Sequence, residues 1–115
     1  LPVVEYLLPY VNNVDIRTDE YLAKETPLMM ASGKGHLDVT KFLVEKGANL
    51  NLKDIDNWTP LMYASGGGQL DAAKYLIEEG ADPKLKEDIK TGRTAYDFAL
   101  EYGHSEVAEY LEQFN

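Results

Sequence analysis

Residues 26–51 read TPLMMASGKGHLDVTKFLVEKGANLN, and residues 59–84 read TPLMYASGGGQLDAAKYLIEEGADPK. The two stretches are identical at 15 of 26 positions after a shift of 33 residues. An internal repeat with a period of roughly 20 to 50 residues is typical of a solenoid, in which each unit buries its apolar face only against the neighbouring units. The repeat, and not a single central core, therefore decides the fold.

Further copies of the unit extend toward both ends of the chain. A third copy begins at Thr94, 35 residues after Thr59, and Leu1–Asp15 matches only the back half of a unit. From this half-unit we expect at least one more helix ahead of Leu1. We predict a single domain of residues 1–115, which comprises a partial N-terminal repeat and loop (1–25), a repeat (26–58), a repeat with a longer loop (59–93) and a C-terminal capping repeat (94–115).

The local chemistry of each unit predicts two short helices and a projecting turn. A threonine at 26 and at 59 can accept a hydrogen bond from a free backbone N–H group, and the proline that follows each loses no donor at the first helical position. Glycines at 33 and 35, and at 66–68, end this first helix. Apolar residues at i, i+3 and i+4 predict a second helix, which ends at Gly47 or Gly80. No unit shows the alternation typical of a strand.

The segments Thr26–Ala31 and Thr59–Ala64 resemble the T-P-L-H-x-A motif of the ankyrin-repeat family. The resemblance covers essentially the whole chain and implies an all-α ankyrin-repeat solenoid of stacked helix–turn–helix units with projecting β-turn loops. Two features depart from the family pattern. The motif histidine is replaced by methionine at 29 and 62 and by Asp97, so its hydrogen bond to the turn is missing or is supplied by another group. Asn57 stands where the turn usually has glycine, and asparagine tolerates a positive φ.

Composition excludes several classes of partner and location. The 20 acidic residues exceed the 11 basic ones, and the formal net charge of −9 at pH 7 disfavours nucleic acid and anionic membranes as partners. No apolar run is long enough to insert into a membrane. The absence of cysteine rules out disulfides and thiolate sites and is compatible with a reducing compartment, so we expect an intracellular, cytoplasmic location.

No constellation of residues in the sequence points to catalysis. The run Gly66–Gly68 lacks the preceding strand and the following Lys-Ser/Thr pair of a phosphate-binding loop, and we interpret it as the turn between two helices. His36 and His104 occupy equivalent positions in different repeats, so they cannot share a metal ion, and we expect them to pack at the start of the second helix. We therefore expect no enzymatic activity, no cofactor and no metal site.

The family resemblance instead implies a partner-binding surface, which would lie on the concave face formed by the turn tips and the first helix of each unit. Carried over position by position, the candidate partner-binding residues are Leu22, Glu25, Lys34, Ile55, Asp56, Trp58, Lys90, Arg93 and Tyr102. Trp58 has two possible roles. It is either an exposed binding anchor, since tryptophan is enriched at interface hot spots, or a packing residue against Ile55 or a neighbouring turn.

The sequence therefore predicts a non-enzymatic protein–protein interaction module. Part of the acidic excess would favour a partner with a basic surface, although most of it is interpreted as solvated helix faces. Two alternatives remain open: a regulatory or targeting segment of a larger enzyme or channel, and a structural spacer that self-associates through its apolar N-terminal half-unit. In addition, the setting of Asn51 resembles the sites of asparagine hydroxylation in ankyrin repeats.

Overall fold

The computed structural model describes residues 25–88, 90 and 92–114. The helices are α2 (Pro27–Lys34), α3 (Leu37–Glu45), α4 (Pro60–Gly66), α5 (Leu70–Glu78), α6 (Ala95–Glu101) and α7 (Ser105–Glu112). No strand occurs within the described residues, and the prediction of an all-α repeat fold is confirmed. The half-unit expected over residues 1–15, together with Leu22, lies outside the described residues.

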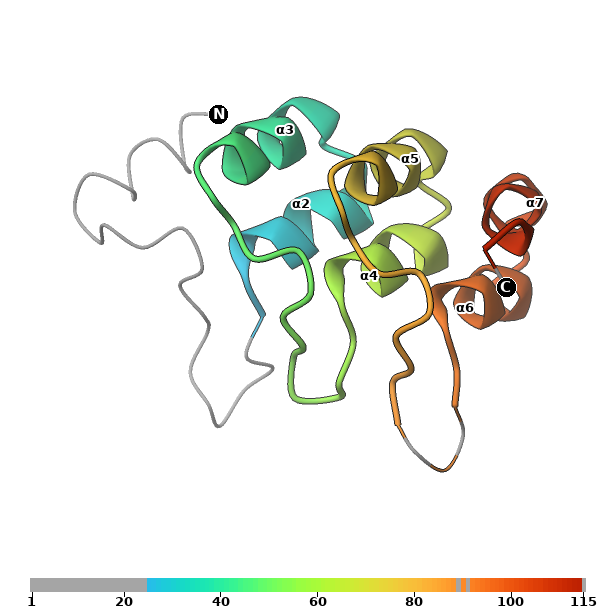
Figure 1. Ribbon diagram of the computed structural model, residues 1–115. Helices are drawn as coiled ribbons and strands as arrows, with labels where there is room; N and C mark the ends of the chain where they lie inside the picture. Colours follow the sequence, from blue (N-terminus) through green and yellow to red (C-terminus); the bar gives the residue numbers. More distant parts are fainter. Residues whose placement is uncertain (1–24, 89, 91, 115) are drawn as a thin grey trace.

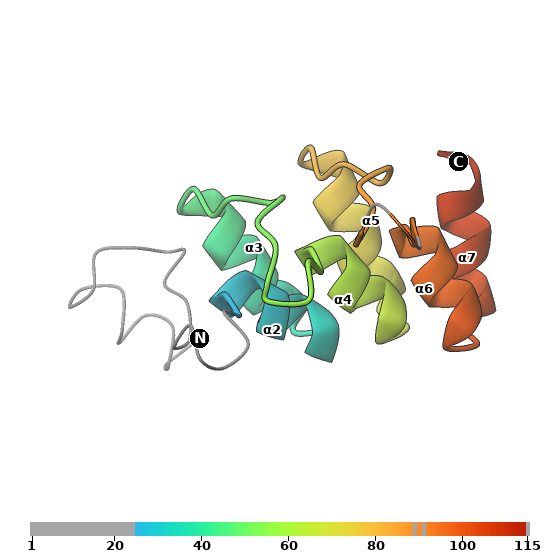
Figure 2. The ribbon, with the colours of Figure 1, turned by 90° about the horizontal axis from the view of Figure 1, so that it is seen from below.

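The helices form two layers (Figure 1). Helices α2, α4 and α6 lie side by side in one layer, α3, α5 and α7 lie in the other, and long loops project away from both. Figure 2 shows the same array from below, with the three helix pairs in succession. Within the first layer α2 packs on α4 and α4 packs on α6, while α3 contacts α5 and α5 contacts α7 in the second. Each pair is therefore held by its neighbours in the stack.

The residues at the motif histidine position cap their own helices. In α2 the hydroxyl of Thr26 accepts a hydrogen bond from the N–H of Met29, and the sulfur of Met29 accepts one from the N–H of Thr26, both at 3.3 Å. Thr59 and Met62 repeat this exchange at the start of α4. At the start of α6, a carboxylate oxygen of Asp97 accepts from the N–H of the capping threonine at 2.9 Å. The missing histidine is thus replaced by side chains that close each helix start.

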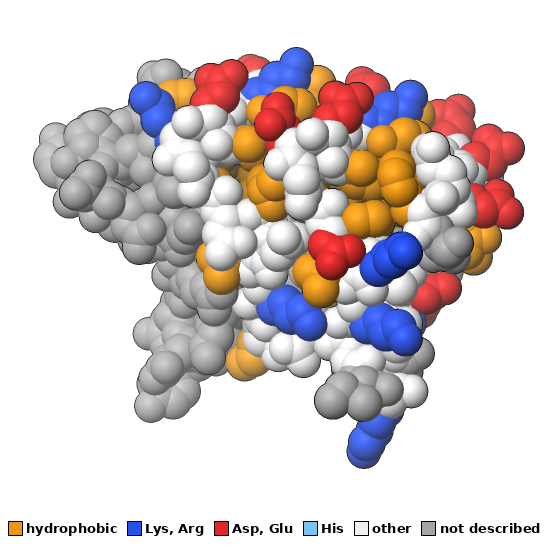
Figure 3. Space-filling view, viewed as in Figure 1, with side chains coloured by type: hydrophobic (Ala, Val, Ile, Leu, Met, Phe, Trp, Pro, Cys, Tyr) orange, Lys and Arg blue, Asp and Glu red, His pale blue; other side chains and the backbone are white. Residues whose placement is uncertain are grey.

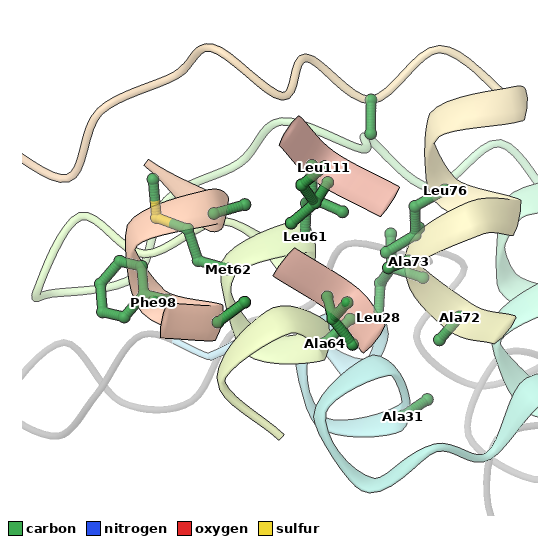
Figure 4. Packing of buried hydrophobic residues seen from close by; sticks show 14 of the residues in the cluster. Leu28, Ala31, Leu61, Met62, Ala64, Ala72, Ala73, Leu76, Phe98 and Leu111 are labelled. Carbon is green, nitrogen blue, oxygen red and sulfur yellow. The ribbon is translucent and has the colours of Figure 1, made fainter. Parts of the chain in front are cut away.

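The core runs along the array between the two layers (Figure 4). Leucines from both layers fill it, and alanines stand where helices approach one another closely. The residues no more than 1% exposed include Leu28, Leu43, Leu61, Leu76, Phe98 and Leu111. Because these side chains come from every described helix pair, the burial of one pair depends on the presence of the next.

The backbones of α2 and of the turn after α4 approach most closely at Gly67. A Cβ atom on Gly67 would lie 2.4 Å from the carbonyl oxygen of Gly33, a distance that real Cβ atoms essentially never show. The φ of Gly67 is −86°, so any residue could adopt this backbone conformation. Space, and not conformation, therefore requires glycine at this position.

Substituting Gly67 with alanine tests this packing constraint. We expect Gly67→Ala to lower the free energy of unfolding by about 1–3 kcal/mol, because backbone must move to admit the methyl group. The neighbouring Gly66→Ala is the matched control, since its Cβ would only make an ordinary 3.5 Å contact with Tyr102. This control should leave stability unchanged or raise it by up to ~1 kcal/mol. Urea unfolding followed by circular dichroism measures both, and equal effects of the two substitutions would contradict the constraint.

Candidate functional site

A buried carboxylate organises the turn between α3 and α4. Asp54 is 5% exposed, and its Oδ1 accepts hydrogen bonds from the N–H groups of Asp56 and Trp58, each at 2.9 Å. Its Oδ2 accepts one from the hydroxyl of Tyr63. Asn57 adopts a φ of 65°, as its tolerance of positive φ predicts. Asp54 therefore fixes both the turn and the position of the Tyr63 ring.

A second buried carboxylate stands at the equivalent position of the next repeat. Glu87 is 6% exposed, and its Oε2 accepts a hydrogen bond from the indole Nε1 of Trp58 at 2.9 Å. The same carboxylate pairs with the guanidinium of Arg93, which also pairs with Glu101. The Arg93 guanidinium lies 4.6 Å from the centre of the Phe98 ring. Glu87 thus joins two successive turns.

The Trp58 side chain is half-buried in this arrangement. The centre of its ring system lies 4.6 Å from that of Phe98 and 5.5 Å from that of Tyr63. Phe98 lies in α6 of the C-terminal repeat, whereas Trp58 lies just before α4, so the indole packs across a boundary between units. The sequence leaves two roles open for Trp58, a packing residue or an exposed binding anchor. The buried part of its side chain has the packing role, and Trp58 also lines a groove.

A groove of about 490 Å³ crosses α2 and α4 and reaches Tyr102, the residue that caps the C-terminal end of α6. Glycines form part of its lining, at 33, 66 and 67. Its larger apolar side chains come from α2, from α4, from the turn before α4 and from Tyr102. Glu25 and Lys34 also line it. The large side chains that line the groove include Met30, Trp58, Tyr63 and Tyr102. Met30 is 43% exposed and Tyr102 is 50% exposed, so the groove offers apolar surface to a partner.

The structure brings together only part of the predicted site. Glu25, Lys34, Trp58 and Tyr102 all line the groove. The other described candidates lie outside this lining. Arg93 is connected to the groove only through Glu87, which binds Trp58. Ile55 and Asp56 are exposed in the 54–58 turn. Lys90 is exposed in the loop between α5 and α6.

Sequence reasoning missed the contribution of Met30 and Tyr63. Both stand four residues after a capping threonine, where large side chains in two successive repeats could have indicated an exposed row on the first helix. The glycines at 33 and 66 were interpreted only as turn residues. In the structure they lie at the groove, and Gly33 is close enough to Tyr63 that a Cβ would lie 3.4 Å from the Tyr63 side chain.

The residues that precede α5 and α7 contact backbone carbonyl groups of the preceding unit. The Nε2 atom of His104 lies 3.0 Å from the carbonyl oxygen of Gly66, and Gln69, at the equivalent position one repeat earlier, donates to the carbonyl of Gly33 at 3.5 Å. This contact agrees with the structural role expected for His104. Among the described residues, no group of three or more His, Cys, Asp or Glu side chains could hold a metal ion.

The environment of Tyr63 predicts a pH-dependent contribution to stability. Burial raises the pKa of Tyr63 far above the ordinary value of 10.0, and the negative charges of Asp54 and Glu25 add to this rise. The folded state thus binds the phenol proton more tightly than the unfolded chain does. The resulting stabilisation is fully present below the unfolded pKa and falls as the pH rises above about 10.

Comparison of the wild type with Tyr63→Phe tests this linkage. We expect wild-type stability to fall more steeply than that of Tyr63→Phe as the pH increases beyond about 10, because phenylalanine has no proton to lose. Urea unfolding of both proteins at neutral and alkaline pH gives the two slopes. Parallel slopes would show that Tyr63 has an ordinary pKa in the folded protein.

The two acidic partners of Arg93, one buried and one half-exposed, allow a matched test of the Glu87–Arg93 pair. We expect Glu87→Ala to lower the free energy of unfolding by about 1–3 kcal/mol, since it removes the acceptor of both Trp58 and Arg93. Glu101→Ala removes the half-exposed partner of the same guanidinium and should cost less than about 1 kcal/mol. Chemical denaturation measures both changes. Trp58 is the single tryptophan, so a shift of its fluorescence in Glu87→Ala alone would report the lost indole contact.

Comparison with known proteins agrees with this architecture. No individual curated protein matches the chain at a significant level of similarity. Within the described residues no helix has the length and apolar character that a bilayer span requires. A family model described as ankyrin repeats (three copies) matches residues 1–87, about three quarters of the chain. Ankyrin repeats are generally protein–protein interaction modules and are typically non-enzymatic. Together with the stacked helix pairs and their Thr-Pro helix starts, this match shows that the chain belongs to the ankyrin-repeat family.

Proposed function

We propose that this chain is a non-enzymatic module that binds a protein partner through the groove across α2, α4 and the C-terminal end of α6. The observation that carries the proposal is the groove itself, a hollow of about 490 Å³ with exposed apolar side chains at Met30 and Tyr102. Methionine and aromatic residues are enriched at protein interfaces, and anchors in well-packed pockets account for most of the binding energy. A segment of the partner would place an apolar side chain in this hollow.

The rigidity of the groove wall supports the proposal. Asp54 holds the Tyr63 hydroxyl and Glu87 holds the indole of Trp58, so neither ring has to be ordered when a partner arrives. A preorganised surface loses little conformational entropy on binding. The exposed Ile55 and Asp56 extend the proposed surface toward the turn tip.

Charges at the groove support a defined orientation of the partner. Glu25 and Lys34 both line the hollow, and they carry opposite charges. Charges at the rim of an interface contribute more to specificity and association rate than to affinity. The acidic Glu25 and the basic Lys34 would therefore fix the direction in which a bound segment runs.

Tyr102 provides the test, because it is exposed and lines the groove. We expect Tyr102→Ala to weaken binding of the partner by more than about fivefold, and to leave stability nearly unchanged. Leu100→Ala is the matched control: Leu100 lies in the last turn of α6, two residues before Tyr102, is 53% exposed and does not line the groove. Affinity capture with wild type and both variants, followed by quantitative mass spectrometry, identifies proteins lost only with Tyr102→Ala. Partners that bind both variants as well as wild type would contradict the proposed surface.

A further inference from the structure

The loops that follow α3 and α5 form a second hollow, of about 870 Å³. Four lysines line it: Lys53, Lys84, Lys86 and Lys90. We call this surface the lysine face. Figure 3 shows Lys and Arg side chains gathered over these loops, whereas acidic and basic side chains alternate over the helices above them. This surface is distinct from the groove proposed above, since the two hollows share no lining residue.

The lysine face has an excess of positive charge. Two carboxylates, those of Glu87 and Asp88, also line the hollow, but Glu87 is buried and already pairs with Arg93. Both ion pairs found among the described residues use Arg93, and neither involves one of the four lysines. This local excess stands against a formal net charge of −9 for the whole chain.

Hydrogen bonds between the two loops hold the lysine face in shape. The ammonium group of Lys53 donates to the backbone carbonyl of Lys86 at 3.0 Å. The side-chain oxygen of Asn51 accepts a hydrogen bond from the N–H of Asp82, also at 3.0 Å. The side-chain oxygen of Asp82 accepts in turn from the N–H of Lys84. The spacing between the backbones of the two loops is therefore set before any ligand binds.

We propose that the lysine face binds an acidic segment of a partner protein, rich in aspartate and glutamate. Exposed ammonium groups attract carboxylates, and although one exposed pair contributes little, several charges that act together contribute more. A short segment can match the lysine face alone. A long polyanion or an anionic membrane would also meet the exposed carboxylates of Glu78 and Glu79 at the C-terminal end of α5, from which the second loop starts, and be repelled by them.

A labelled peptide of alternating aspartate and glutamate is the probe for this proposal. We expect it to bind wild-type protein at low salt, as measured by fluorescence anisotropy, and to be released as the salt concentration rises. The double variant Lys84→Gln with Lys86→Gln should weaken binding roughly five- to tenfold. The control, Lys46→Gln with Lys74→Gln, removes the same charge from helix-side lysines and should weaken it by less than about twofold. Circular dichroism verifies that both variants remain folded.

Three results would overturn the proposal. The first is a wild-type protein that does not bind the peptide, and the second is an equal loss of affinity in the two double variants, which would indicate a general charge effect. The third is tighter binding of a single-stranded oligonucleotide, or of vesicles containing anionic lipid, that is lost with Lys84→Gln and Lys86→Gln. Tyr102→Ala should bind the acidic peptide like the wild type, and this keeps the test separate from that of the groove.

Discussion

The close approach of successive helix pairs is the constraint on which the whole structure depends. Two short helices joined by a turn cannot bury their apolar sides alone, so leucines from each pair must meet those of the next. This requires small residues where backbones converge, and at Gly67 even a methyl group does not fit against the carbonyl of Gly33. The glycines at 33, 66 and 67 also line the groove, where larger side chains would fill part of the hollow.

The two buried carboxylates show how one repeat position can serve different partners. Asp54 binds the backbone of its own turn and the hydroxyl of Tyr63, which belongs to the following helix. Glu87, 33 residues later, instead binds the indole of Trp58 from the preceding turn and the guanidinium of Arg93. One carboxylate therefore stabilises a turn, and the other connects two turns. Both keep the aromatic wall of the groove in place without the histidine of the family motif.

Local signals in the sequence were sufficient to predict the helices but not the contacts between repeats. The Thr-Pro pairs and the glycines define where α2 and α4 begin and end, and the asparagine at 57 adopts the positive φ expected of it. The bond from Trp58 to Glu87 could not be predicted, because the loop before α6 carries two extra residues and its path is not determined by repeat spacing. The lysine face did have a signal, since Lys53 and Lys86 are 33 residues apart and therefore equivalent.

Glu87 lies between the lysine face and the groove, and it connects them without neutralising the lysines. Glu87 lines the hollow of the lysine face, but its negative charge is balanced by Arg93. One of its carboxylate oxygens also accepts a hydrogen bond from the Trp58 indole, which borders the groove. A free carboxylate at this position would neutralise part of the lysine charge and attract the ammonium groups inward. Because the guanidinium takes that role, Lys84, Lys86 and Lys90 remain exposed to solvent. One partly buried ion pair thus supports the Trp58 ring beside the groove and preserves the positive charge of the lysine face.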